Sequence, residues 1–569
     1  MSKLSIKTEK QKQSLLFPPT LEELIPSTHV VRIVNEIIER LNIENILVSY
    51  RGGGNSCYSP KMMLKILVYS YLNNVYSCRK IEQQLHENIN FMWLSGMSYP
   101  DYRTINYFRD KRLKGNFDVI FTQVVELLHQ EGFVHLDVQY IDGTKIESSA
   151  NKYTFVWRKS IEKYDSRLKS KTVALLRQIS ENNSLESEGL PFGEELSADD
   201  FQSHIESIRV KLRDRALSRE DKKTLKAIEE ESIPRMQKYA GDLAIMKDRN
   251  SYSKTDPQAT FMRMKEDAML NGQLKPGYNV QISTENQFIT NYAIYQRPTD
   301  TLTLIPYLQT FEQRYGRQSP VIVADSGYGS EQNYDYLFNN GIIPYVKYNM
   351  FHKEQKRKYI QNAYLPSNLY YNKDGNYYVC PIGQHLGFIR EEERKSESGY
   401  LSRVSIYRAC RCAGCPMRAM CHKSRHDRQL EVNHTLNEYK SRVRELLLSE
   451  EGVRHRSKRP VEPEAVFGQI KECGKFRRFR LKGISGANLE FGLKALAHNL
   501  RKMAEKTCLI IFFTRFYSWE EKYEAYFSCY DNGGGVMRHK MKFAGEDEIR
   551  WEKKLPNFFI VRQPLFCFL

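Results

Sequence analysis

Three features are scarce or missing in this chain of 569 residues. No stretch reaches the roughly 18 consecutive apolar residues that a membrane-spanning helix needs, which argues against a helical membrane protein. The start of the chain lacks the apolar core and the small-residue cleavage site of a secretion signal. Eleven cysteines are too few for a disulfide scaffold of this length, so a reducing compartment is expected. We therefore expect a soluble, cytoplasmic protein.

Positive charge is what the chain has in excess. Lys and Arg number 86 against 68 Asp and Glu, which gives a formal net charge of +18. Hydrophobic residues at 41% and aromatic residues at 12% exclude a disordered chain. Nucleic-acid binding, an anionic membrane surface and a merely solvated basic surface all explain such a charge. The run KFRRFRLKG at 475–483 favours a polyanionic partner.

The first part of the chain has helical periodicity. A polar tail at 1–19 precedes 20–132, where apolar residues recur at helical spacing. Ser59 is placed as an N-cap before Pro60, and Gly96 is placed as a C-terminal cap. Cations on these helices suit contact with a phosphate backbone, although a solvated helical bundle explains any one of them equally well. They are Arg79, Lys80, Arg103, Arg109, Lys111 and Arg112.

Strand and helix patterns alternate in the middle of the chain. The pattern predicts strands at 134–149, 277–285, 288–296, 320–325 and from 341, and helices at 299–316, with Thr299 or Asp300 as cap, and 331–339. Charge-rich residues 155–250 predict two long, mostly exposed helices that form an insert. This order predicts an α/β fold in which a mixed sheet is flanked by helices.

Two aspartates stand where such sheets usually place ligands. Asp142 follows four apolar residues on the core-facing side of its strand, and Asp325 follows the apolar run PVIVA. Both are expected at the carboxyl ends of strands. An ionised carboxylate buried there needs a metal, a cation or hydrogen-bond donors.

Glu464 is the best candidate for a third acid. Pro463 suits the first position of a helix, so Glu464 is expected in the first turn, with Lys471 on the same helical face. Glu462 is expected to point elsewhere, as a cap or surface acid, and is a minor rival. Two Mg²⁺ ions held by carboxylates can promote in-line displacement at phosphorus. Cations that suit a phosphodiester substrate follow: Lys475, Arg477, Arg478, Arg480 and Lys482.

Cysteines cluster between the second aspartate and the glutamate. Residues 346–458 carry strand-like stretches and the sequence CRCAGCPMRAMCH. One interpretation is a structural zinc site formed by Cys380, Cys412, Cys415 and Cys421, with Cys410, His385 and His422 as spare ligands. The other interpretation is a set of buried free thiols.

A family resemblance joins these motifs. YIDGTKIES, VADSGYGS and PEAVFGQIK...FRRFRLKG...LAHNLRKM together resemble the DDE transposases of bacterial insertion sequences. SYRGGGNSCYSPKMMLKILVYSYLNNVYSCRKIEQQL and PDYRTINYFR resemble the helical N-terminal domain of that group. The resemblance covers roughly 15–505. It implies an RNase H-like catalytic core, two Mg²⁺ or Mn²⁺ ions, and double-stranded DNA partners, namely terminal inverted repeats and a target.

The resemblance also implies roles for individual residues. Asp142, Asp325 and Glu464 are the implied catalytic and metal-binding acids, and Lys471 the implied phosphate contact. Many relatives carry a Tyr and an Arg at fixed spacings before the Glu. Here Arg459 lies one residue further away than in that pattern, and Ser457 takes the Tyr position. Relatives carry a similar cysteine arrangement.

The whole sequence is thus interpreted as a transposase that cuts transposon ends and joins them to target DNA, as a homodimer or larger assembly in a bacterial, nucleoid-associated setting. The alternatives are a transposase-derived DNA-binding protein that does not cut and a metal-dependent nuclease. The expected domains are a tail (1–19), a helical DNA-binding or dimerisation domain (20–132), a catalytic core (133–345 and 459–505), a cysteine-containing insertion (346–458) and an extension of unknown role (506–569).

Overall fold

The computed structural model describes residues 19–50, 56–183, 196–211, 218–264, 272–519, 526–530 and 536–540, with side chains up to residue 507. The chain divides into two compact units, Met1–Lys502 and Met503–Leu569. In the described ranges, no helix is both long enough and apolar enough to cross a membrane.

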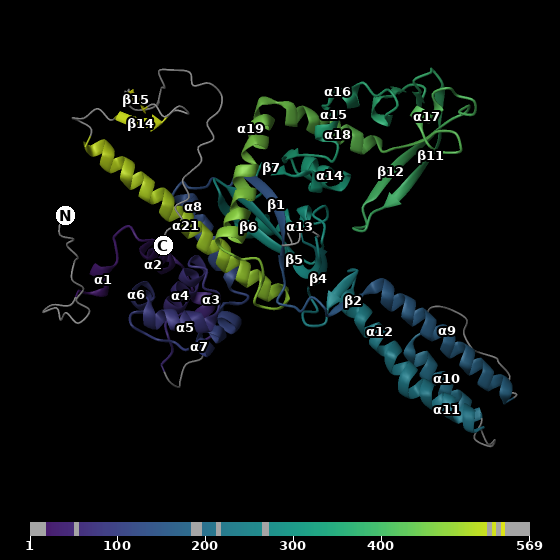
Figure 1. Ribbon diagram of the computed structural model, residues 1–569, viewed down its shortest axis with the longest axis horizontal. Helices are drawn as coiled ribbons and strands as arrows, with labels where there is room; N and C mark the ends of the chain where they lie inside the picture. Colours follow the sequence, from purple (N-terminus) through teal and green to yellow (C-terminus); the bar gives the residue numbers. More distant parts are fainter. Residues whose placement is uncertain are drawn as a thin grey trace, which may run out of the picture. The chain divides into compact units, whose positions relative to one another are not determined.

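The N-terminal region is helical, as predicted (Figure 1). Ser59 accepts a hydrogen bond from the Met62 N–H at the start of α4, where Pro60 is the first helical residue. Gly96 ends α6 in the left-handed conformation, at φ 54°. The elements are α1 (Leu21–Leu24), α2 (Val30–Arg40), α3 (Glu44–Leu47), α4 (Pro60–Leu72), α5 (Cys78–Glu87), α6 (Ile89–Ser95), α7 (Tyr102–Tyr107), the π-helical turn η1 (Phe108–Leu113) and α8 (Phe117–Gln130).

The main sheet is mixed, as predicted, and has six strands in the order β4-β5-β1-β7-β8, with β6 also paired to β5. Neighbours β1, β7 and β8 are parallel, and the other pairings are antiparallel. The sequence pattern did not indicate β4. The strands are β1 (Val138–Glu147), β4 (Thr260–Arg263), β5 (Leu274–Glu285), β6 (Phe288–Tyr295), β7 (Val321–Ala324) and β8 (Ile343–Val346).

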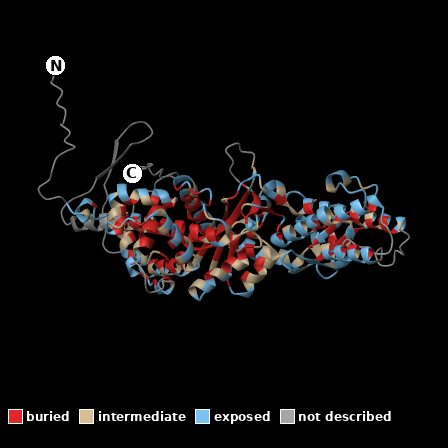
Figure 2. Ribbon diagram, turned by 90° about the horizontal axis from the view of Figure 1, so that it is seen from below, coloured by how far each residue is buried: buried red, intermediate tan, exposed pale blue. Residues whose placement is uncertain are grey.

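Helices α13 (Leu304–Tyr315), α14 (Glu331–Asn339) and α18 (His434–Leu448) share one apolar core with this sheet, whose strands are largely buried (Figure 2). Helix α13 begins after Thr303, not after Thr299 or Asp300 as predicted. The Asp300 carboxylate instead accepts hydrogen bonds from side chains of β5, so it cannot cap the helix.

The insert after β1 differs from the two exposed helices predicted. The described part contains α9 (Arg158–Asn182), α10 (Ala198–Lys211), α11 (Arg219–Ala227), the π-helical turn η2 (Ile228–Ser232) and α12 (Ile233–Met246). These helices bury an apolar cluster of their own, which the charge-rich composition hid; it includes Leu176, Ile179, Phe201, Ile205 and Leu225. The pair β2 (Phe155–Trp157) and β3 (Ser251–Ser253) joins the two ends of the insert. Residues 184–195 of its Ser/Glu/Gly-rich stretch lie outside the described residues.

The cysteine-containing region forms a second, antiparallel sheet in the order β13-β12-β11-β10-β9. Its strands are β9 (Tyr370–Asn372), β10 (Tyr377–Val379), β11 (His385–Lys395), β12 (Leu401–Ala409) and β13 (Gln429–Val432). Short helical segments flank it: α15 (Phe351–Glu354), α16 (Arg357–Ile360), η4 (Pro366–Asn368) and α17 (Arg418–Cys421).

A nearly continuous helical segment follows α18. It consists of α19 (Glu450–Lys458), the π-helical turn η5 (Pro460–Glu464), α20 (Ala465–Gly468) and a second π-helical turn η6 (Gln469–Cys473). Helix α21 (Gly483–Trp519) crosses the division at Met503, and the second unit contains the hairpin β14 (Tyr526–Tyr530) and β15 (Val536–Lys540).

Candidate active site

Two of the three predicted acids lie on neighbouring parallel strands. Asp325 directly follows β7, as predicted, but the prediction that Asp142 ends its strand is wrong, because β1 continues to Glu147 in its antiparallel pairing with β5. Ile141 of β1 is the register partner of Ala324 of β7. Asp142 and Asp325 are the next residues along the two chains, so the register brings them side by side. Asp325 also caps the short helix η3 (Ser326–Tyr328), because its carboxylate accepts the Ser326 N–H at 2.7 Å.

The third acid reaches this edge of the sheet from a π-helical turn. The prediction that a helix begins at Pro463 is wrong, since Pro463 lies inside turn η5. A proline has no N–H to donate to the preceding turn, and a π-helical turn accommodates such an interruption. In an α-helix, residues four apart share a face, whereas the wider π-helical turn aligns residues five apart. Arg459 and Glu464 therefore face the same way despite the extra residue between them.

Arg459 joins all three acids. Its Nη2 lies 3.0 Å from Asp142 Oδ1 and 3.7 Å from Asp325 Oδ2, and its Nη1 lies 2.5 Å from Glu464 Oε1. The Arg459 side chain is 6% exposed, Asp142 is 17% exposed, and Asp325 and Glu464 are each 48% exposed. Three carboxylates from distant parts of the sequence thus contact one buried guanidinium, and two of them remain accessible to a substrate.

Glu462, the rival acid, does not reach this cluster. It is buried, and its Oε2 accepts the Gln287 N–H at 2.8 Å in the turn between β5 and β6. The expectation that it is a cap or surface acid is therefore wrong. Its position two residues before Glu464 turns it toward the sheet's hairpin.

Two lysines border the acids. Lys471 Nζ donates to Thr144 Oγ1 at 2.5 Å, and Thr144 lies two residues after Asp142 on the same face of β1. Lys347 follows β8, next to Asp325, and sequence reasoning did not find it. Burial lowers the pKa of the Lys347 ammonium, and the positive charge of Arg459 lowers it further.

The sequence pattern also did not indicate a buried polar network that lies behind the acids. Asp300 Oδ1 accepts hydrogen bonds from Asn279 at 2.7 Å and from Gln281 at 2.8 Å, and Gln281 accepts one from the Tyr328 hydroxyl. A Cβ on Gly143 would overlap the Gln281 amide and the Asp300 carboxylate, so a larger residue directly after Asp142 would have to displace this network. The signal was the alternation of Asn279 and Gln281 with apolar residues in a strand buried on both faces.

The cationic residues that follow Glu464 in the sequence make different contacts. Arg478 donates to the carbonyls of Ser148 and Ala150 and therefore has a structural contact, while Arg477 pairs with Glu472. Lys475 is exposed and left-handed, at φ 49°. Arg480 is also exposed and lines a separate pocket.

Whether the acid cluster can bind a divalent metal depends on the atoms that it offers as ligands. In the described ranges, no three His, Cys, Asp or Glu side chains lie close enough together to hold a metal ion. At the acid cluster the Arg459 guanidinium is the cation that the three carboxylates share. Carboxylate oxygens are the donors that Mg²⁺ and Mn²⁺ prefer, so the chemistry of the set fits a divalent ion in place of that guanidinium.

The four predicted cysteine ligands line one small cavity of about 20 Å³, together with His422 and Arg428. Three sulfurs accept hydrogen bonds: Cys380 from the Gln384 N–H, Cys412 from the Arg428 N–H and Cys421 from the Arg428 guanidinium. Of the spare candidates, Cys410 is exposed and His385 stacks on Tyr377. The thiols share a cavity, but their present spacing is not that of a metal site.

Comparison with known families gives two matches. Residues 379–504 match a transposase DDE domain, and residues 19–111 match a transposase domain (DUF772). The two matches indicate a DDE transposase of the insertion-sequence type. No curated protein and no solved structure matches the chain.

The matched segments cover part of the acid cluster. Glu464, Arg459 and Lys471 lie inside the DDE match, whereas Asp142 and Asp325 precede it. The strand register and the contacts with Arg459 bring the two aspartates next to the matched segment.

Proposed function

We propose that this chain is an active transposase that cleaves phosphodiesters at transposon ends and joins the freed ends to target DNA, with Asp142, Asp325 and Glu464 as its catalytic acids. The observation that carries the proposal is the contact of all three carboxylates with the Arg459 guanidinium. A protein that only binds DNA has no use for three acids at one point, since they repel the phosphates of DNA.

The sheet supports an RNase H-like core. Strands β6, β5 and β1 form an antiparallel run, and β1, β7 and β8 continue it as parallel strands. Asp325 lies at the carboxyl end of β7, and Asp142 lies on β1 just past the last residue that pairs with β7, which is where sheets of this kind hold ligands. Glu464 approaches the same edge from the helical segment that follows the insertion.

The proposed reaction has two displacements at phosphorus. Water attacks a phosphodiester at the transposon end, its oxygen bonds to phosphorus, and the 3′ oxygen leaves with a proton as a hydroxyl. That hydroxyl then attacks a phosphodiester of the target and displaces its 3′ oxygen. Bound Mg²⁺ or Mn²⁺, two ions, would supply activation of the attacking oxygen and stabilisation of the leaving oxygen.

The chain's own residues have separate parts in this scheme. Asp142, Asp325 and Glu464 would hold the divalent ions, and the Asp300 network links β5 to Tyr328, which lies just after Asp325. Lys471 touches a phosphate near the cut, from its position beside Thr144. The double-stranded DNA partners are the inverted repeats and the target, and joining two ends requires two active sites, which favours a dimer.

The experiment uses a supercoiled plasmid that carries the gene of this chain with its native flanking DNA. With Mg²⁺ we expect the wild type to cut at both flanks and to produce strand-transfer products, and Asp142→Asn to do neither. Asp137→Asn is the matched control, because Asp137 lies just before β1 and its side chain is 61% exposed. Equal activity of wild type and Asp142→Asn would contradict the proposal.

Two other outcomes identify the alternatives. Binding of the flanking DNA without cutting by the wild type would indicate a transposase-derived DNA-binding protein. Cutting without strand transfer would indicate a metal-dependent nuclease.

We also propose that the cysteine cavity takes up a structural zinc ion, which would draw Cys380, Cys412, Cys415 and Cys421 together. Backbone N–H groups already point at the sulfurs of Cys380 and Cys412, and all four sulfurs line the same cavity. Purified protein should contain about one zinc per chain, and Cys412→Ser should lose it while Cys473→Ser, at an exposed cysteine, should keep it. Zinc-free protein with unchanged thermal stability would contradict this.

A further inference from the structure

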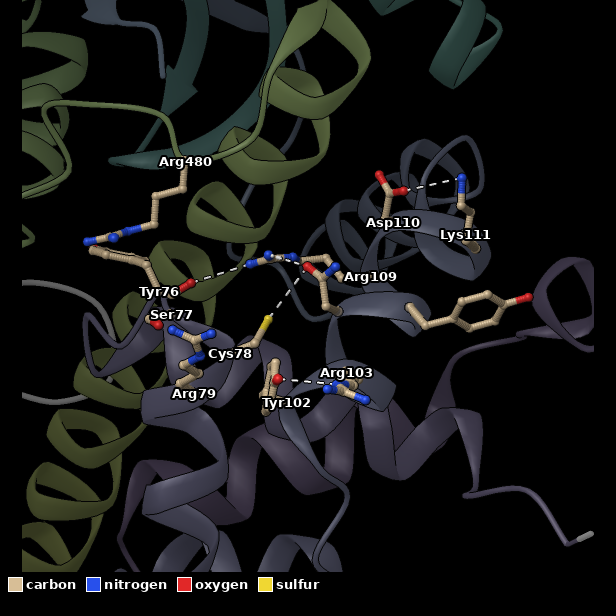
Figure 3. A pocket seen from close by; sticks show the side chains of 12 residues that line it. Tyr76, Ser77, Cys78, Arg79, Tyr102, Arg103, Arg109, Asp110, Lys111 and Arg480 are labelled. Carbon is tan, nitrogen blue, oxygen red and sulfur yellow. Dashed lines mark hydrogen bonds and ion pairs between the residues drawn. The ribbon is translucent and has the colours of Figure 1, made fainter. Parts of the chain in front are cut away.

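A second site lies away from the acids. It is a pocket of about 560 Å³, within the roughly 300–1,000 Å³ typical of ligand sites. We call it the cationic pocket (Figure 3). Its lining comes from α5 and the two residues before it, from α7 and η1, and from the segment before α21: Tyr76, Ser77, Cys78, Arg79, Tyr102, Arg103, Asn106, Tyr107, Arg109, Asp110, Lys111 and Arg480.

The charge of the cationic pocket selects an anion. Five lining residues are cations and one, Asp110, is an acid, which is already paired with Lys111 and Lys114. Arg109 is 6% exposed; it donates to the Tyr76 carbonyl and to Asn106 Oδ1. A fixed buried guanidinium with exposed cations around it attracts phosphate groups.

The aromatic side chains of the cationic pocket select a base or sugar in addition to phosphate. Arg79 and Arg103 both lie over the Tyr102 ring, at 5.1 and 5.7 Å from its centroid, and Arg103 also donates to the Tyr102 hydroxyl at 3.2 Å. The Tyr107 side chain is exposed, at 54%. Tyrosine rings beside exposed guanidinium groups are among the elements with which proteins bind unpaired nucleotides.

The cationic pocket is tied to the strand that carries Asp142. Buried Glu490 accepts the N–H groups of Arg480 and Leu481 and so fixes the backbone at Arg480. One residue earlier, the Phe479 N–H donates to the carbonyl of Glu147, the last residue of β1, at 2.8 Å. The segment that lines the pocket is therefore hydrogen-bonded directly to β1.

We propose that the cationic pocket binds one unpaired nucleotide of the substrate DNA, with its phosphates on Arg79 and Arg103 and its base against the tyrosine rings. This inference rests on the proposed function, and it adds a grip on a single strand at a point separate from the acids. A pocket of this size admits one nucleotide, whereas a duplex keeps its bases inside the stack.

The test measures binding without cleavage. Full-length protein without added Mg²⁺ or Mn²⁺ is titrated against a fluorescent 20-nucleotide oligo-dT and against a duplex of the same length, at several salt concentrations. Tyr102→Leu should weaken binding of the single strand roughly ten-fold, and Tyr102→Phe, which keeps the ring, should not. Arg79→Gln with Arg103→Gln should weaken it further and lower the salt dependence by about 0.7 per lost phosphate contact. Lys222→Gln with Lys223→Gln, at exposed lysines of α11, is the matched control.

The contrast between the two DNAs decides the proposal. Selective loss of single-strand binding, with duplex binding within two-fold of the wild type, would support it. Equal losses on both DNAs, unchanged single-strand binding, or no single-strand binding by the wild type would overturn it. Asp142→Asn should bind the single strand as the wild type does. The binding result therefore does not depend on whether the protein cuts DNA.

Discussion

At the residue scale, Arg459 is the centre of the acid cluster. Its guanidinium is almost fully buried and contacts three carboxylates, which together carry more negative charge than it can balance. Such a cluster depends strongly on its cation, because removal of one member of a buried ion pair leaves the others uncompensated. Arg459 thus keeps the acids together until a divalent ion replaces its charge.

The substitution Arg459→Gln tests this role without any activity measurement. In EDTA it should lower the free energy of unfolding by about 3 kcal/mol, because the carboxylates then repel one another. Mg²⁺ should raise the melting temperature of the variant more than that of the wild type. Arg477→Gln, which removes an exposed pair with Glu472, should cost under about 1 kcal/mol. An equal response of Arg459→Gln and wild type to Mg²⁺ would contradict the role.

Lys494 provides a pH-dependent test of the packing around α21. Burial lowers the pKa of its ammonium to about 7, from its ordinary value of 10.5, with a further contribution from Arg501. Below pH 7 the lysine is charged in both folded and unfolded chains, and above pH 10.5 it is neutral in both. Between these values the unfolded chain binds more protons, so this residue makes stability rise with pH.

Relative to Lys494→Met, the wild type should therefore gain about 3–5 kcal/mol of stability between about pH 7 and pH 10. Urea unfolding at three pH values measures the gain. The free energy of unfolding of Lys223→Met, a variant at an exposed lysine, should change with pH as that of the wild type does. If the free energies of unfolding of Lys494→Met and the wild type changed equally with pH, the lowered pKa of the Lys494 ammonium would be contradicted.

At the element scale, the π-helical turn η5 explains a departure from the family pattern. Arg459 lies one residue further from Glu464 than the family resemblance implies, and the wide π-helical turn between them still directs both side chains toward each other. Buried His455 before the turn and buried Val466 after it both keep their contacts with the core.

Deletion of Val461, which is exposed in this turn, should convert it to an α-helical turn and leave the flanks in register. We expect the melting temperature to change by only a few degrees, since a π-helical turn is no more stable than the α-helical turn that replaces it. Deletion of exposed Ser441 in α18 is the control, because it rotates Val443 and Leu447 out of the core and should cost about 3 kcal/mol or more. Comparable losses in both deletions would contradict the account of η5.

The sequence predicted those elements whose patterns are local. Helix α14 has the predicted bounds, and β7 ends just before Asp325, as its apolar run predicted. The end of β1 was mispredicted at Asp142, because the pairing that extends it to Glu147 is with β5, which is distant in the sequence. Turn η5 could not be predicted, since Pro463 equally suits a helix start and only the contacts of Arg459 distinguish the two. Asp300 was misread as a cap because its partners, Asn279 and Gln281, are distant in the sequence.

At the scale of the whole molecule, the net charge of +18 is distributed among distinct tasks. Arg459 balances the acids, Arg478 ties its own segment to the chain after β1, and Arg79 and Arg103 line the cationic pocket. The excess of cations therefore does not translate directly into contacts with DNA. Composition alone predicted an anionic partner, and only the folded chain separates the structural cations from the accessible ones.

The most direct measurement of the central claim is calorimetric titration of Mn²⁺ into the wild type and into Asp142→Asn, Asp325→Asn and Glu464→Gln, with Asp137→Asn as control. If the three acids form one site, each of the three substitutions should weaken the same binding event at least about ten-fold, and the control should bind as the wild type does. Unchanged Mn²⁺ binding in any one of the three variants would contradict a shared site.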